Sequence, residues 1–170
     1  TLLLKYYHVQ ADEGNPQLVA ELLGHRSKVR QQHSDLILSL GNEYVSYQEG
    51  MARHWTEFNR LLDQNINEVR ESNYPELQVV TLMRKSQRSL LSEMESLSEI
   101  ILLDNEVSLN DLELWQRKQK ALMLDVVERY IERAASSMGA PLTIDQVDIA
   151  VVCKQFERGI TELQGKLTSP

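Results

Sequence analysis

The fold is decided by residues 16–72, which read PQLVAELLGHRSKVRQQHSDLILSLGNEYVSYQEGMARHWTEFNRLLDQNINEVRES. Apolar side chains recur along this stretch at steps of four, three and four residues. Thirteen of fifteen positions in the series are apolar or aromatic, and the other two are histidines: Leu18, Leu22, His25, Val29, His33, Leu36, Leu40, Tyr44, Tyr47, Met51, Trp55, Phe58, Leu62, Ile66 and Val69. Such a repeat has a period of about 3.67 residues and predicts a nearly straight α-helix with one apolar stripe.

Glycine and proline divide the chain into helices. Gly41 lies near the middle of the long stretch and is the best candidate for a break in it. Beyond the stretch, we expect helices over 75–104, 108–138 and 143–166. Asn15, Ser108 and Thr143 are each predicted to cap the start of a helix. No run of alternating apolar and polar residues is long enough to predict a β-strand.

These lengths predict an all-α fold, with an antiparallel four-helix bundle over 41–170 and a long N-terminal helix extending from it over 1–40. The first eleven residues could cover only about two to three turns of the stripe in this extension. Either the chain folds back at Gly41, or the stripe pairs with a second copy or with another protein. We expect the stripe to lack internal cover and residues 41–170 to fold without it.

Composition excludes several classes of protein. The chain has 25 acidic and 18 basic side chains, a net charge of -7 and one cysteine. Nucleic-acid binding and docking on anionic lipid both need a basic surface, and disulfide scaffolds need more cysteine. The charge is spread at -1 or -2 per segment, so no acidic patch is expected. No apolar run approaches the roughly 18 residues of a membrane-spanning helix, so we expect no membrane insertion by this segment.

The main functional hypothesis is a non-enzymatic helical module that binds protein along the N-terminal stripe. An apolar strip without internal cover should be buried by a partner. We expect a homo-oligomer or a heterologous protein complex in the cytoplasm, with no cofactor or metal ion. His25 and His33 would set the register of the contact. The predicted partner-binding residues are Leu18, Leu22, His25, Val29, His33, Leu36 and Leu40.

A second hypothesis is an extracytoplasmic ligand-sensing bundle of a bacterial membrane receptor, which would be periplasmic. Residues 1–7 would then be the end of a membrane helix, and the ligand would lie between helices. The aromatic side chains of Tyr44, Tyr47, Trp55 and Phe58 are the predicted lining of its pocket. Aromatic residues at helical spacing also form ordinary cores, and that alternative stays open.

A third hypothesis is a phosphotransfer or cofactor-binding bundle that uses His25 or His54. The sequence from His25 to Lys28 resembles the His-x-x-Lys pattern of phosphotransfer bundles, but Val29 follows where that pattern has a small residue. His54 and Glu57 lie one turn apart, without the Glu-x-x-His pairs of di-iron bundles. No motif of nucleophilic or metal-assisted catalysis is present, so we predict that the chain is not an enzyme.

Overall fold

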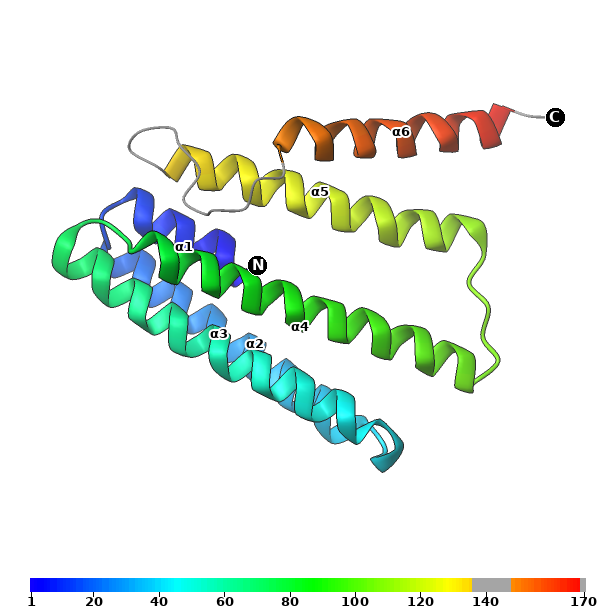
Figure 1. Ribbon diagram of the computed structural model, residues 1–170, viewed down its shortest axis with the longest axis horizontal. Helices are drawn as coiled ribbons and strands as arrows, with labels where there is room; N and C mark the ends of the chain where they lie inside the picture. Colours follow the sequence, from blue (N-terminus) through cyan, green and yellow to red (C-terminus); the bar gives the residue numbers. More distant parts are fainter. Residues whose placement is uncertain (136–147, 169–170) are drawn as a thin grey trace.

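The computed structural model describes residues 1–135 and 148–168, and these residues form helices and short connections only (Figure 1). The elements are α1 (Leu2–Ala11), α2 (Pro16–Ser39), the 3-10 helix η1 (Asn42–Tyr44), α3 (Val45–Ser72), α4 (Leu77–Asp104), α5 (Asp111–Ala135) and α6 (Ile149–Thr168). The described part of the chain contains no strand. The predicted all-α class is therefore confirmed.

The long stretch breaks at Gly41, as its composition suggests. Helix α2 ends at Ser39, and Leu40 and Gly41 have extended backbones before η1 begins. The Gln48 side chain donates hydrogen bonds to the carbonyl groups of Leu40 and Gly41, at 3.3 and 3.1 Å. The Glu43 carboxylate occupies the space that a side chain at position 41 would need. The backbone of Gly41 is one that any residue can adopt, so a larger side chain there would require only that the Glu43 side chain move.

Beyond this turn the chain folds back, so that α3 lies beside α2 (Figure 1). Arg26 of α2 forms an ion pair with Asp63 of α3. The imidazole of His33 stacks on the indole of Trp55, with 5.4 Å between the ring centroids. Leu22, in the first half of the stripe, is fully buried. The expectation that the stripe lacks internal cover is therefore wrong along most of α2.

Helix α1 is the most deeply buried element of the fold. It contacts α2, α3 and α5, and its apolar side chains lie in the main core with those of α3 and α4. Four of them are fully buried: Leu3, Tyr6, Tyr7 and Val9. Helix α1 and the first turns of α2 therefore belong to the core.

Helices α3 and α4 form the closest pair, and they run in opposite directions. The start of α3 lies beside the end of α4, where the Tyr44 hydroxyl donates to Asp104 at 2.9 Å. Helix α6 packs on α5, where the Trp115 indole N–H donates to the carbonyl of Gly159 at 2.7 Å. With α1 and α2 sharing the core, this arrangement does not confirm the predicted four-helix bundle over 41–170.

The helix starts agree only partly with the predicted caps. The Asn15 side chain caps α2 by accepting from the amide of Gln17 at 2.9 Å, as predicted. Helix α5 begins at Asp111, with Asn110 and Glu113 exchanging side-chain to backbone hydrogen bonds in a capping box. Ser108 is therefore the wrong cap by two residues. The cap predicted at Thr143 lies outside the described residues.

Candidate functional site

An open hollow of about 590 Å³ lies between the α2–α3 turn and the C-terminal end of α4. Both of these segments lie toward the lower right of Figure 1. Three predicted site residues, Leu36, Leu40 and Tyr44, come together in the hollow. The full lining is Leu36, Ser39, Leu40, Gly41, Glu43, Tyr44, Ile101, Asp104 and Asn105. The hollow thus combines aliphatic side chains with carboxylates and contains no basic group.

The same end of the molecule exposes apolar side chains. Leu38 is 83% exposed and Leu103 is 75% exposed, the two highest values among the large apolar side chains that the structure describes. Val45 and Val107 are also exposed there. Single exposed aliphatic residues are common on soluble proteins, but a group of them beside a hollow is typical of a binding surface.

Acidic residues surround this apolar surface. We call residues 34–52 and 89–107 the acidic tip, because they hold eight acidic side chains and no lysine or arginine: Asp35, Glu43, Glu49, Glu93, Glu95, Glu99, Asp104 and Glu106. The rest of the chain has 17 acidic and 18 basic side chains. The expectation that no acidic patch exists is therefore wrong: residues 89–107 alone hold five of these carboxylates, and the fold brings the three from 34–52 to the same end.

Local electrostatics reflect this excess of negative charge. The hydrogen bond from the Tyr44 hydroxyl to Asp104, together with the charges of Asp104 and Glu43, raises the pKa of Tyr44. The Glu93 carboxylate lies against Gly50, so it is held close to the start of α3. Arg117 of α5 reaches the edge of the tip and donates to the Ser98 hydroxyl at 3.0 Å. The acidic tip therefore remains strongly negative.

The other predicted partner-binding residues lie farther along α2, toward the core. Leu22 is fully buried, and Leu18 and Val29 pack against the core from its edge. His25 is half-buried, and burial and then the charge of Lys5 lower its pKa. Only the last two members of the predicted set, Leu36 and Leu40, therefore reach the hollow.

The four aromatic residues predicted to line a ligand pocket are not gathered in one place. Trp55 and Phe58 belong to the main core, where their rings stack with centroids 6.2 Å apart. Tyr44 lines the hollow of the acidic tip, and Tyr47 is half-buried on α3. Burial lowers the pKa of His33, which stacks on Trp55, while a hydrogen bond with the backbone of Met51 acts in the opposite direction.

A second polar region, which the sequence analysis missed, lies between α4 and α5. We call it the buried charge layer, and it consists of Arg84, Gln87, Asp125, Glu128, Arg129 and Glu132. The Arg84 side chain is 3% exposed and pairs with Glu132, which is equally buried, and with Asp125 at 3.5 Å. Arg129 also pairs with Asp125, at 3.0 Å. Gln87 donates to Glu128 at 3.0 Å.

The buried charge layer also ties α1 to α5. The Thr1 hydroxyl donates to Glu128 at 2.8 Å. The Tyr7 hydroxyl has no hydrogen-bond partner among the described residues; burial first, and then the nearby charge of Glu132, raise its pKa. The only sequence signal for this layer is the polar interruption of the α4 apolar stripe at 84–89, which a solvent-facing helix would show equally well. Long-range pairing between α4 and α5 therefore had to be seen in the structure.

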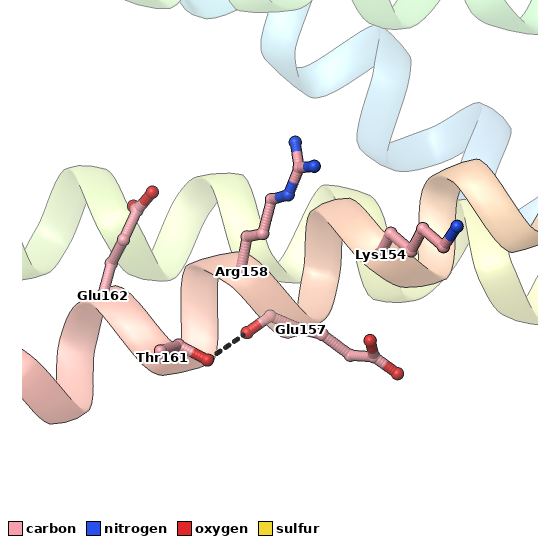
Figure 2. Close-up of a pocket in the computed structure, with 5 residues that line it drawn as sticks. All are labelled: Lys154, Glu157, Arg158, Thr161 and Glu162. Atoms are coloured by element: carbon pink, nitrogen blue, oxygen red, sulfur yellow. Dashed lines mark hydrogen bonds between the residues drawn. The ribbon is translucent and has the colours of Figure 1, made fainter.

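A further hollow of about 390 Å³ lies along α6 and is lined by Lys154, Glu157, Arg158, Thr161 and Glu162. Figure 2 shows that all five side chains come from this one helix and extend in different directions. The hydrogen bond drawn there runs from the Thr161 hydroxyl to the carbonyl oxygen of Glu157, at 3.1 Å. This is a solvated helix face of mixed charge, and no other described element adds a side chain to its lining.

Other kinds of site find no support in the described residues. No group of three His, Cys, Asp or Glu side chains within them is placed to hold a metal ion. Glu57, considered above as a ligand beside His54, forms an ion pair with Arg60 at 2.7 Å. Within 1–135 and 148–168, no helix is both long and apolar enough to span a membrane.

Comparison with known proteins gives no relatives. No family model matches the chain, and neither a curated protein nor a solved structure shows significant similarity to it. Inference about function therefore rests on the acidic tip and the buried charge layer.

Proposed function

We propose that this chain is a non-enzymatic helical module that binds another protein through the acidic tip. The observation that carries the proposal is the open hollow with exposed apolar side chains beside it, of which Leu38 and Leu103 are the most exposed large apolar residues that the structure describes. Removing apolar side chains from water lowers the free energy, and a bound partner protein would remove these side chains from water. The predicted contact along the N-terminal stripe is thereby reduced to its last turn, at Leu36 and Leu40.

Self-association through the acidic tip has less support than binding of a different protein. Two copies meeting tip to tip would bring together two strongly acidic surfaces, with eight carboxylates each and Arg117 as the one cation that is seen to reach the edge in the described part of the chain. Like charges across an interface destabilise it. Light scattering distinguishes the two forms, since self-association gives a dimer or larger species and heterologous binding leaves the isolated chain monomeric.

The two other hypotheses stay predictions with weaker support. A ligand pocket lined by the four aromatic residues finds little support, because Trp55 and Phe58 are core residues. Phosphotransfer requires an exposed histidine, and His25 is half-buried on the face of α2 that carries Leu22. A cytoplasmic location and its periplasmic alternative both remain predictions.

Site-specific photo-crosslinking in the source cell tests the proposal. A photoreactive residue placed at Leu38 or Leu103 should give a discrete protein adduct, and the same residue at Tyr74 should not. Tyr74 is 44% exposed and lies at the opposite end of α3 and α4. Combining the photoreactive residue with Leu40→Ser should abolish the adduct, because this substitution removes an apolar side chain that lines the hollow. Equal adducts at all three positions, or adducts unaffected by Leu40→Ser, would contradict the proposal.

A further inference from the structure

We infer that the partner segment bound by the acidic tip is a basic amphipathic helix, carrying lysine or arginine on one face and aliphatic side chains on the other. This inference rests on the proposed protein-binding function and specifies the chemistry of its partner. It follows from three properties of the acidic tip: its charge, its apolar hollow and its secondary structure.

The charge of the acidic tip requires a cationic partner. Seven of its eight carboxylates are exposed, and Glu93 is half-buried. Glu43 and Asp104 line the hollow itself, on opposite elements, so a cation entering it would meet carboxylates from η1 and from α4. Anionic partners such as nucleic acids and acidic lipids are repelled by such a surface.

The hollow requires that the same partner also bring aliphatic side chains. Leu36, Leu40 and Ile101 supply its apolar wall, and Leu38 and Leu103 extend apolar surface outside the hollow. A purely polar basic peptide would leave this surface in water. The volume of the hollow, about 590 Å³, is enough for several side chains of a partner but too small for a folded domain. A few aliphatic side chains from an amphipathic segment would cover the apolar wall and would also fit within this volume.

The secondary structure favours a helical segment. Extended peptides bind proteins by adding a strand to the edge of a sheet, and the described residues include no sheet. The hollow lies between the end of α2 and the end of α4, which gives two helical walls. Helices bind in such grooves by presenting side chains at i, i+3, i+4 and i+7.

A designed peptide provides a direct probe. We would use a short helical peptide of leucine and lysine, with leucine at i, i+3 and i+4, and a matched peptide in which glutamate replaces lysine. Fluorescence anisotropy of each labelled peptide is measured with the full chain. We expect the lysine peptide to bind and the glutamate peptide not to bind. Raising the salt concentration from about 0.05 to about 0.5 M should weaken binding by tenfold or more.

Charge reversal at the tip locates the binding. The double variant Glu43→Lys with Asp104→Lys should weaken binding of the lysine peptide by about tenfold, because two attractive pairs are replaced by two repulsive ones. The control is Glu71→Lys with Glu76→Lys, which changes the net charge equally at the other end of α3 and α4, where both residues are exposed. It should change the affinity by no more than about twofold.

Leu40→Ser tests the apolar half of the inference without changing the charge, and it should also weaken binding of the lysine peptide. Circular dichroism establishes that each variant is folded. The inference is overturned by any of three results: equal binding of both peptides, equal effects of the two charge reversals, or no binding of the lysine peptide. These results leave the crosslinking test of protein binding unaffected, so the two proposals fail separately.

Discussion

Removing Arg84 should destabilise the fold more than removing any exposed arginine. In the Arg84→Met variant, Glu132 loses its partner while its side chain stays 3% exposed, and its other carboxylate oxygen already lacks a partner among the described residues. Water cannot replace the guanidinium at such a site. Breaking a buried ion pair in this way costs about 3–5 kcal/mol. For a chain of this length, the melting temperature should fall by about 10 °C.

A double-mutant cycle isolates the interaction energy between Arg84 and Glu132 from the effects of their other contacts. Glu132→Met alone should cost less than Arg84→Met, because Arg84 keeps its contact with Asp125. The double variant should cost less than the sum of the two single changes, since two apolar side chains can pack where two charges were removed. The free energy of unfolding is measured by urea titration followed by circular dichroism.

The matched control is Arg60→Met. Arg60 pairs with Glu57 on α3, and both side chains are about half exposed, at 57% and 46%. Removing an exposed pair of this kind costs at most about 1 kcal/mol. If Arg84→Met proves no more destabilising than Arg60→Met, or if the two changes in the cycle are simply additive, the reasoning about the buried charge layer is refuted.

Two further predictions concern the N-terminal helices. Deleting residues 1–40 removes all of α1 and α2 from the core, so we expect the truncated chain to lose its cooperative unfolding transition in urea. A truncated chain that still unfolds cooperatively would contradict this assignment of the core. Burial lowers the pKa of His33, so the unfolded chain binds its proton more strongly, and stability should fall as the pH drops below about 6.5. His33→Phe keeps the stack on Trp55 without titrating, and it should lose less stability between about pH 7 and pH 5 than the parent chain does; an unchanged pH profile would refute this.

The sequence by itself determined the local structure. The spacing of apolar residues predicted helices, because a helix brings positions three and four residues apart onto one face. Gly41 was the right place for the break, and Asn15 was the right cap for α2. These features depend on a few neighbouring residues, so they can be read from a short window of sequence. Ser108 was misplaced because Asn110 offered a capping box in the same window.

Only the tertiary structure decided which surfaces are buried. The stripe looked uncovered because α1 is short, yet α1 contacts α2, α3 and α5, and α2 also meets α3 through the Arg26–Asp63 ion pair and the stack of His33 on Trp55. Nothing in the sequence pairs Arg84 with Glu132, which lies 48 residues away, until α4 and α5 bring the two side chains together. Five carboxylates of the acidic tip already lie together in residues 89–107, and only the packing of α2, α3 and α4 brings the other three to the same end. Pairings between residues far apart in the chain depend on how the helices pack, and periodicity within one helix does not contain that information.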